Sequence, residues 1–333
     1  MTADEAAMRR AMALAAGVRT STSPNPWVGS VVLPPGRRVN DQEPGGFEGA
    51  TQPPGGPHAE VVALQAAGDA ARGATLYVTL EPCAHTGRTA PCVDAIVDAG
   101  IARVVVGVED PDERVRGAGV RALRAAGVTV DVGVCAEEVR AQLAPYLKHR
   151  STGRPWVVLK LGATLDGRTA APDGSSRWIT GPAARADAHR MRAESDALIV
   201  GAGTVRADDP ELTVRDAPGK DPLRVVLGHA PADAKVQPAM EMKGDLGRVL
   251  DELGDRGVLQ ALVEGGATVA GDFHRAGLVD RYVLYLAPAL FGGDDARPLF
   301  TGPGAPTIAD VWRGRIVAFE QLGDDLRVEC SPA

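Results

Sequence analysis

Four residues in the first third of the chain have the types and spacing of a metal-dependent hydrolase. His58 and Glu60 stand two positions apart in HAEVVAL, and Cys83 and Cys92 enclose the segment AHTGRTAP, each cysteine directly after a proline. A catalytic zinc ion takes three protein ligands of the N or S type and keeps one position for water. His58, Cys83 and Cys92 therefore predict a zinc site with an open position. Glu60 is predicted to carry protons at that position without being a ligand.

Two other interpretations of these residues stay open: a structural zinc knot, and two ordinary buried cysteines. Structural zinc sites usually have four protein ligands, whereas only three converge in this sequence. His85, inside the segment between the cysteines, could be a fourth ligand, although a role at the substrate is favoured. The order HAE, EPC, PC favours a catalytic site.

The elements that must position these residues are those of an α/β domain. Apolar β-branched runs alternate with alanine-rich helical patterns in WVGSVVL, HAEVVALQAAGDAA, TLYVTL, CVDAIVDAG and RVVVGV. A second alternating series runs from residue 154 to residue 293 and has no metal-ligand pattern. The segment 143–155, LAPYLKHRSTGRP, is predicted to be a linker after a short helix. We place the domain boundary near Ser151 and expect residues 34–57 and 214–222 to be irregular.

Composition limits the classes of partner and of compartment. The net charge of −7 argues against a broad nucleic-acid or anionic-membrane surface. The N-terminus is unlike a signal peptide, and no apolar run approaches the roughly 18 residues of a membrane-spanning helix. Four cysteines make a poor disulfide framework for 333 residues, which favours a reducing compartment. We therefore expect a cytoplasmic protein that binds neither nucleic acid nor membrane.

The motif PHAE with EPCAHTGRTAPC resembles the zinc nucleobase deaminases, whose usual pattern has two residues between the cysteines. The longer segment here resembles the deaminase half of the bifunctional riboflavin-biosynthesis deaminases and reductases. Supporting motifs cover nearly the whole chain in order: SPNPWVGSVV, VEDPD, LKLGATLDGRTA, SSRWITG, VGAGTVRADDPELTVR and LVEGGATVAGDF. The resemblance implies an α/β fold with two parts. These are a cytidine-deaminase-like three-layer domain over residues 1–150 and a dihydrofolate-reductase-like domain over residues 151–333.

For the first domain, the resemblance implies hydrolytic deamination of 2,5-diamino-6-(5-phosphoribosylamino)pyrimidin-4(3H)-one by a zinc-activated water, with Glu60 as proton carrier. Asn25 resembles the family's contact to the pyrimidine edge, and an Asx turn is its alternative. Arg88 is predicted to bind the phosphate or ribose, because its fork of donors suits phosphate oxygens. A solvated loop arginine is the alternative there. His85 is expected at the same substrate.

For the second domain, the resemblance implies reduction by NADPH of the ribose of 5-amino-6-(5-phosphoribosylamino)uracil to a ribityl chain. No G-x-G-x-x-G follows its first strand, so a Rossmann fold is not indicated. The implied substrate contacts are Lys160, Ser176, Arg177, Thr180, Arg192, Asp208, Leu212, Arg215 and Glu264. The implied cofactor contacts are Ala163, Trp178, Ile179, Thr204, Asp208, Gly265, Gly266, Ala267 and Thr268.

Two features of this second domain also follow from the residues themselves. The glycines of VGAGTV and VEGGATVAG follow apolar strands and open a helix or turn, where backbone N–H groups can hold phosphate. Lys160 lies in an otherwise apolar strand and would need an anionic partner if buried. Asp208 or a ligand phosphate is the expected partner, and a solvent-facing Lys160 is the alternative.

The chain departs from the family pattern in two places. Residues 34–57 are longer and more irregular, and the stretch from VVLGHAPADAKV to GDLGRVLDEL is shorter. Two rival classes are a zinc deaminase of another base or nucleotide with an inactive or differently used second domain, and a noncatalytic zinc-stabilised protein. The expected partners are small phosphoribosyl pyrimidines and further copies of the chain, as a dimer or tetramer.

Overall fold

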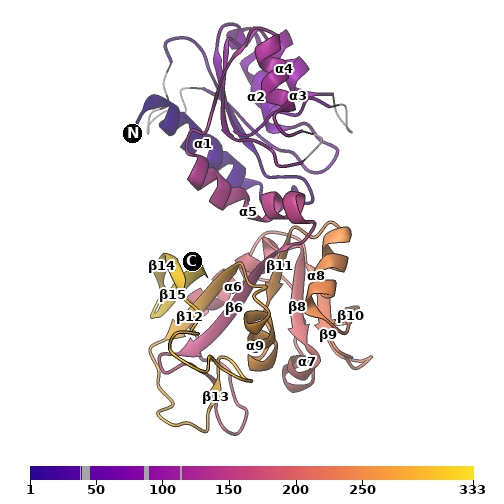
Figure 1. Cartoon of the computed structure of the whole chain (residues 1–333), viewed down its shortest axis with the longest axis vertical. Coiled ribbons are helices and arrows are strands. Elements are labelled where there is room, and N and C mark those ends of the chain that lie inside the picture. The colour runs from indigo at the N-terminus through magenta and orange to yellow at the C-terminus, as the bar shows by residue number, and fades with distance from the viewer. Residues whose placement is uncertain (38, 40–45, 86–89, 113–114) are drawn as a thin grey trace. The chain divides into compact units, whose positions relative to one another are not determined.

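The structure is a computed structural model that describes residues 1–37, 39, 46–85, 90–112 and 115–333. The chain divides into two compact units, Met1–Thr152 and Gly153–Ala333 (Figure 1). Among the described residues, no helix combines the length and the apolar character that crossing a membrane requires.

The first unit contains one five-stranded sheet. Its elements are α1 (Ala3–Gly17), β1 (Gly29–Leu33), β2 (Phe47–Ala50), α2 (Ala59–Ala67), the 3₁₀ helix η1 (Gly68–Ala71), β3 (Thr75–Leu80), α3 (Cys92–Asp98), β4 (Arg103–Val108), α4 (Ala118–Ala125), β5 (Thr129–Val132) and α5 (Ala136–Thr152). The strand order is β2-β1-β3-β4-β5. Strand β1 is antiparallel to β2 and β3, whereas β3, β4 and β5 are parallel.

Helices cover both faces of this sheet because small residues let them approach the strands. A Cβ at Gly29 would lie 1.8 Å from the carbonyl oxygen of Ala11 in α1, and one at Gly49 would lie 2.2 Å from that of Ala59 in α2. Gly49 pairs with Ser30, the neighbour of Gly29, and successive strand residues face opposite sides. Helices α1 and α2 therefore lie on opposite faces (Figure 1). The layers are helix, sheet and helix.

The prediction of a linker at the end of this unit is wrong. Helix α5 continues to Thr152 through the segment predicted to be a linker, with Pro145 inside it. Proline removes one helical hydrogen bond, but burial of its turn offsets the loss. Leu143, Pro145 and Tyr146 are all buried, and the Tyr146 hydroxyl donates to Asp110 at 2.9 Å.

The expectation that residues 34–57 are irregular is also wrong in part. Residues Phe47–Ala50 form β2, which pairs with β1 from Val32↔Phe47 to Gly29↔Ala50. Glycine and proline surround the segment, and a strand of only four residues leaves little pattern in the sequence. Local propensity does not favour a strand there, but hydrogen bonding to β1 stabilises it.

The second unit contains an eight-stranded sheet and a small two-stranded ribbon. Its elements are β6 (Trp156–Thr164), β7 (Arg168–Ala170), α6 (Pro182–Ala193), β8 (Ala197–Gly201), α7 (Ala202–Asp208), β9 (Leu223–Leu227), β10 (Met240–Met242), α8 (Leu246–Asp255), β11 (Gln260–Val263), α9 (Ala267–Arg275), β12 (Arg281–Ala287), β13 (Arg297–Pro298), β14 (Gly314–Leu322) and β15 (Asp325–Pro332). The large sheet has the order β10-β9-β8-β11-β6-β12-β15-β14, and β13 pairs with β7.

The large sheet is parallel from β10 to β12, and β15 and then β14 extend it in antiparallel pairs. Alternate residues of β6 enter two apolar clusters. Val157 and Leu159 pack with α8 and α9, whereas Val158 packs with α6 and α7. The sheet is therefore buried on both faces, as parallel sheets usually are. Strands β8, β9, β10 and β11 all have their carboxyl ends at one edge of the sheet, where ligands commonly bind in such sheets.

Candidate functional site

The predicted metal ligands come together in the first unit from three separate segments. His58 is the N-cap of α2, Cys83 lies in the loop after β3, and Cys92 begins α3. The ligand atoms of these three side chains all lie within 4.8 Å of one another. His58 Nδ1 is 3.2 Å from Cys92 Sγ and 3.7 Å from Cys83 Sγ. His85, exposed and two residues after Cys83, is not part of this group.

These positions fit a zinc ion. Tetrahedral zinc with its usual bonds to nitrogen and sulfur holds those atoms about 3.6 Å apart. The observed separations of 3.2 and 3.7 Å bracket that value. Hydrogen bonds from the Cys92 side chain, His58 and the Cys92 backbone N–H outweigh burial and lower the pKa of the Cys83 thiol to about 4. The site therefore stabilises the thiolate of Cys83, the form that a metal requires, whereas the hydrogen bond to Cys83 and burial raise the pKa of the Cys92 thiol.

Glu60 lies in the first turn of α2 and is only 4% exposed. Burial raises the pKa of its carboxyl, and the nearby His58 opposes part of that rise. Its carboxyl also interacts with the Cys92 side chain. A buried carboxyl of raised pKa beside a metal-ligand set is what a proton carrier at this position needs.

Glu81, in the motif EPC, holds the ligand loop rather than the metal. Its buried carboxylate accepts hydrogen bonds from the backbone N–H groups of Asp110, Gly117 and Val120 at 3.2, 2.9 and 3.1 Å. Gly119 brings α4 against the same loop, because a Cβ there would lie 1.9 Å from the Pro82 carbonyl oxygen. The loop that carries Cys83 is thus fixed by residues 29 to 39 positions after Glu81.

Two of the three predicted deaminase substrate contacts lie in described segments. Asn25 is half-buried in the turn before β1, and its backbone N–H donates to Thr22 at 2.8 Å. His85 is exposed beside the ligand loop. Arg88 lies outside the described residues. Their roles as substrate contacts stay predictions.

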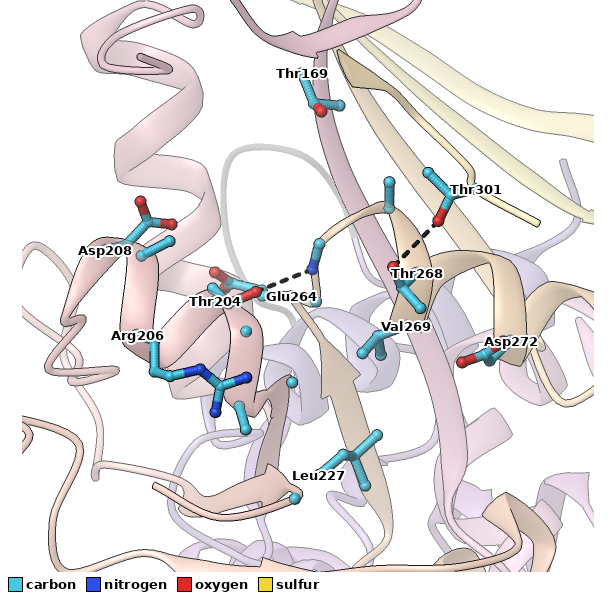
Figure 2. A pocket seen from close by; sticks show the side chains of 18 of the residues that line it. Thr169, Thr204, Arg206, Asp208, Leu227, Glu264, Thr268, Val269, Asp272 and Thr301 are labelled. Carbon is cyan, nitrogen blue, oxygen red and sulfur yellow. Dashed lines mark hydrogen bonds between the residues drawn. The ribbon is translucent and has the colours of Figure 1, made fainter. Parts of the chain in front are cut away.

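The second unit has a cleft of about 1630 Å³ at the carboxyl edge of its sheet. Several predicted site residues line it: Ser176, Thr204, Asp208, Glu264, Gly265, Gly266, Ala267 and Thr268. Figure 2 shows two hydrogen bonds that tie its walls together. The Gly266 N–H donates to Thr204 Oγ1 at 3.2 Å, and the Thr268 and Thr301 hydroxyls lie 3.1 Å apart. Both glycine-rich segments therefore border one cleft.

Glu264 is the electrostatic centre of this wall. Its side chain is 9% exposed and accepts two hydrogen bonds from Arg192, Nε–Oε1 at 2.9 Å and Nη2–Oε2 at 2.8 Å. Burial raises the pKa of Glu264, but Lys160 and Arg192 outweigh it and hold that pKa at about 2. Glu264 is therefore one anion that Lys160 stabilises within the chain, and Asp208 or a ligand phosphate as its partner stays a prediction. Arg192, which also donates to the Thr213 carbonyl, is engaged within the chain.

The other predicted residues of this unit lie outside the described lining of the cleft. They are Lys160 and Ala163 on β6, Arg177, Trp178, Ile179 and Thr180 before α6, Arg192 on α6, and Leu212 and Arg215 after α7. Trp178 is 67% exposed, with the Arg185 guanidinium 4.6 Å from its ring centre. Arg177 donates to the Asp208 carbonyl at 2.8 Å.

Leu212 has a backbone that bulky residues rarely adopt. Its φ is +56°, and its side chain packs in the cluster beside α6 and α7. Such a conformation costs about 1–3 kcal/mol and occurs most often near functional sites. Because the side chain is buried, any contact of Leu212 with a ligand would use its backbone.

The part of the cleft formed by β9 and β10 was not predicted from the sequence. Leu227, His229 and Lys243 line it there, with Arg206 from α7. Leu227, His229 and Lys243 end or follow a short strand, and Arg206 lies in the last turn of α7, a signal that becomes specific only when the strand order is known. The strand β10 has only three residues, which left its carboxyl end unrecognised.

Comparisons with known proteins match both units of the chain. Residues 1–108 match the family model described as "Cytidine and deoxycytidylate deaminase zinc-binding region", and residues 155–328 match that of the "RibD C-terminal domain". Two curated relatives bear the name "Riboflavin biosynthesis protein RibD". The one from Escherichia coli K12 is 39% identical and aligns over 97% of this chain and 98% of its own. The one from Mycobacterium tuberculosis H37Rv is 43% identical, over 93% and 91%.

Solved structures give the same result for the whole chain. RibD of Acinetobacter baumannii superposes with a TM-score of 0.90 at 38% identity, covering 99% of both chains. A diaminohydroxyphosphoribosylaminopyrimidine deaminase/5-amino-6-(5-phosphoribosylamino)uracil reductase of Thermotoga maritima superposes with a TM-score of 0.87 at 33% identity, with the same coverage. The predicted fold class of two α/β domains, of which the first is cytidine-deaminase-like, is confirmed, and the second domain matches the RibD C-terminal domain.

Proposed function

The chain belongs to the RibD family of riboflavin-biosynthesis proteins, and from that premise we propose which of its residues carry the family's two reactions. It is a bifunctional enzyme, a zinc-dependent deaminase and an NADPH-dependent reductase, and its substrates are small molecules. We assign the deaminase to residues 1–150 and the reductase to residues 151–333. The convergence of His58, Cys83, Cys92 and Glu60 in one buried site is the observation that carries the first assignment.

In the deaminase, His58, Cys83 and Cys92 hold zinc. When bound there, zinc supplies a Lewis acid that activates water for attack on the ring carbon bearing the amine. Glu60 takes a proton from the attacking water, gives it to the ring nitrogen and then assists transfer to the leaving amine. The ring carbon gains a carbonyl oxygen as its bond to nitrogen breaks, so one water is consumed for each ammonia released.

Three residues are proposed to orient the phosphoribosyl pyrimidine at this site. Asn25 pairs with the pyrimidine edge through its amide, which both donates and accepts. Arg88 binds the phosphate or ribose, and His85 contacts the substrate rather than the metal. The eight-residue segment between the cysteines is long enough to reach a phosphoribosyl group beyond the ring.

In the reductase, NADPH supplies the hydride that reduces the opened ribose at C1. The cofactor is proposed to lie along the glycine-rich walls of the cleft, with Ala163, Trp178 and Ile179 also in contact. Lys160, Glu264 and Arg192 are proposed to contact the substrate, and Asp208 to contact both ligands. Lys160 and Arg192 keep the Glu264 carboxylate ionised. These residues bind and orient, and the chemistry is that of the cofactor.

The remaining substrate contacts are proposed to surround the phosphoribosyl group. They are Ser176, Arg177 and Thr180 on one segment and Leu212 and Arg215 on another. Arg215 is half-exposed and pairs only with Glu211, at 2.9 Å, among the described residues. Its guanidinium can therefore turn to a phosphate at little cost.

One assay tests both assignments. The zinc-replete protein is mixed with 2,5-diamino-6-(5-phosphoribosylamino)pyrimidin-4(3H)-one and NADPH, while ammonia and NADPH absorbance are followed together. We expect one NADPH oxidised for each ammonia released. Removal of zinc with a chelator should stop ammonia release but leave reduction of the already deaminated substrate. Ammonia without NADPH loss would contradict the reductase assignment, and neither signal would contradict both.

We further propose that the enzyme forms homo-oligomers, dimers or tetramers, through the edge strand β14. Ile316 and Phe319 are 67% and 77% exposed. A bulge at Val317 places both opposite Cys330 and Val328, which share one face of β15, so they form a single apolar strip. An exposed apolar edge strand invites pairing with another chain. Light scattering should give a dimer or tetramer that Phe319→Asp dissociates, and a wild-type monomer would exclude this interface.

We also propose that the enzyme acts in the cytoplasm and binds no nucleic acid. The net charge of −7 disfavours phosphate backbones, and all four cysteines are free thiols. Gel-shift assays with RNA and DNA at low salt should show no complex, and cell fractionation should place the protein with cytoplasmic enzymes. A salt-sensitive complex would contradict the first of these expectations.

A further inference from the structure

One end of the reductase cleft carries positive charges that the proposed reaction does not use. We propose that Arg206 and Lys243 bind the 2′-phosphate of NADPH and so make the enzyme choose NADPH over NADH. His229 supports this site by hydrogen bonding to the Glu241 carboxylate near the same rim. The inference rests on the proposed placement of the cofactor in this cleft.

The sheet register brings the two cations to one edge. In the parallel ladders, Gly201 of β8 pairs with Leu227 of β9, and Leu227 pairs with Met242 of β10. Arg206 follows Gly201 by little more than one helical turn, and Lys243 follows Met242 directly. Two strand spacings are about 10 Å. The long side chains of arginine and lysine can therefore meet a single phosphate from opposite sides.

Both charges are available to a ligand. Arg206 and Lys243 are exposed, line the cleft and form no ion pair with any residue that the structure describes. Figure 2 shows the Arg206 side chain extending from α7 into the cleft, on the side where Leu227 lies. A guanidinium offers a fork of donors that matches phosphate oxygens, and an ammonium adds a compact point charge.

Two acidic residues near this rim, Glu241 and Asp245, are engaged within the chain. Asp245 lines the cleft and is the N-cap of α8, where it accepts from the Arg248 N–H at 3.1 Å. Glu241 accepts hydrogen bonds at both oxygens, from His229 Nδ1 at 2.8 Å and from the Ala230 N–H at 3.0 Å. In dinucleotide sites, a free carboxylate that accepts from the ribose 2′-hydroxyl favours the cofactor without the phosphate, whereas a nearby arginine accommodates the phosphate. Here both carboxylates accept hydrogen bonds within the chain, and Arg206 forms no ion pair with the residues that the structure describes.

The wall of the cleft at the end of β11 differs in charge. Glu264 lines the cleft there, directly after β11, and Arg192 and Lys160 act on it from outside the lining. A dinucleotide in the cleft would therefore place its nicotinamide beside the substrate wall and its adenosine beside β9 and β10. This orientation brings the 2′-phosphate to Arg206 and Lys243.

The test measures binding of nucleotide fragments as well as activity. Calorimetry with 2′,5′-ADP and 5′-AMP compares ligands that differ by the 2′-phosphate alone. For Arg206→Ala we expect a roughly 10- to 100-fold loss of affinity for 2′,5′-ADP, the range of one charge-assisted hydrogen-bonded contact. Lys243→Ala should lose somewhat less, and Arg206→Lys should keep part of the affinity. Affinity for 5′-AMP should change by no more than about threefold in all of them.

A matched control removes an arginine elsewhere in the same unit. Arg256 pairs with Glu252 on α8 and does not line the cleft, so Arg256→Gln should leave both affinities unchanged. In turnover, Arg206→Ala should raise KM for NADPH towards that for NADH while kcat with NADH is kept. Retained kcat with NADH also shows that the variant is folded.

Two outcomes would overturn the inference in distinguishable ways. If the Arg206→Ala and Lys243→Ala variants keep full affinity for 2′,5′-ADP while NADPH is still oxidised, the phosphate lies elsewhere and the reductase assignment stands. If the wild-type enzyme releases ammonia but neither binds 2′,5′-ADP nor oxidises NADPH, both the subsite and the reductase assignment fail.

Discussion

In the deaminase unit, three ligand atoms lie within 4.8 Å of one another beside an acid that is 4% exposed, and all four groups belong to the chain. In the reductase unit, a cleft of about 1630 Å³ is bordered by glycines, hydroxyls and a few charges. In the first site the chain supplies every group except the metal ion, whereas the second site is an open cleft that a whole dinucleotide must fill. A single substitution should therefore change activity strongly in the first unit, whereas in the second unit the contacts are spread over many residues and each substitution should change less.

The largest effect should come from Glu60→Gln. Loss of the proton carrier should lower kcat for deamination by about 10²–10⁴-fold. Reduction of the already deaminated substrate should be unaffected, because it uses the other unit. Asp69→Asn, an exposed acid-to-amide change shortly after α2, is the matched control and should keep full activity. Full deamination by the Glu60→Gln variant would remove the proposed mechanism.

Glu264→Gln is expected to have a large effect in the reductase unit, chiefly on stability. Removing one member of a buried pair leaves Arg192 and Lys160 without their anion, which should destabilise the unit by about 3 kcal/mol. Chemical denaturation of the wild type and the variant measures this. A change below about 0.5 kcal/mol would show that Glu264 is not the centre of the charged wall.

The Glu264 carboxyl should also make the stability of the folded chain fall as the pH is lowered. The pKa of Glu264 is about 2 in the folded chain, below its ordinary value of 4.5. A depressed folded pKa contributes stability that is complete above the unfolded pKa and is lost as pH falls towards the folded one. The wild type should therefore lose this contribution between about pH 4.5 and pH 2, and Glu264→Gln should lack that part of the acid transition.

A smaller effect is expected from Gly49→Ala, which tests whether the deaminase site depends on close packing of α2. The new Cβ would lie 2.2 Å from the Ala59 carbonyl oxygen, so the helix that begins beside His58 must shift. We expect a destabilisation of about 1–3 kcal/mol and weaker zinc retention. Gly17→Ala meets no atom within 4 Å and should be neutral or slightly stabilising. Equal melting temperatures for the two variants would contradict the packing argument.

The smallest effect on stability should come from Arg215→Ala. Its ion pair with Glu211 joins two side chains that are each 51% exposed, and such pairs contribute little. Unfolding free energy should change by less than about 0.5 kcal/mol, while KM for the reductase substrate rises if Arg215 binds its phosphate. An unchanged KM would remove Arg215 from the proposed contacts and leave the stability prediction intact.

The metal-ligand set could be predicted because its residues sit at sequence positions with strong local signals. A histidine before a helix and two Pro-Cys steps near a helix start are visible without any tertiary information. The continuation of α5 through Pro145 could not be predicted in the same way, because burial of Tyr146 and its bond to Asp110 are long-range. Strand β2 was missed for a similar reason.

The end of the chain is a different case, since its signal was present. Strands β14 and β15 are joined through Gly323 and Asp324, with φ of +65° at the glycine, between two alternating runs. That pattern is typical of a hairpin. The far end of the cleft, by contrast, depends on the placement of β9 and β10 beside β8, which no local pattern in a three-residue strand can indicate.

The three backbone hydrogen bonds to Glu81 also bear on how the sequence can change over time. The carboxylate is adjacent to the Pro82-Cys83 step, yet its donors lie at positions 110, 117 and 120. Insertions or deletions between Asp110 and Val120 should therefore be tolerated only when position 81 changes with them. In a deep mutational scan selected for metal content, these distant positions should show epistasis with Glu81 as strong as that between neighbours.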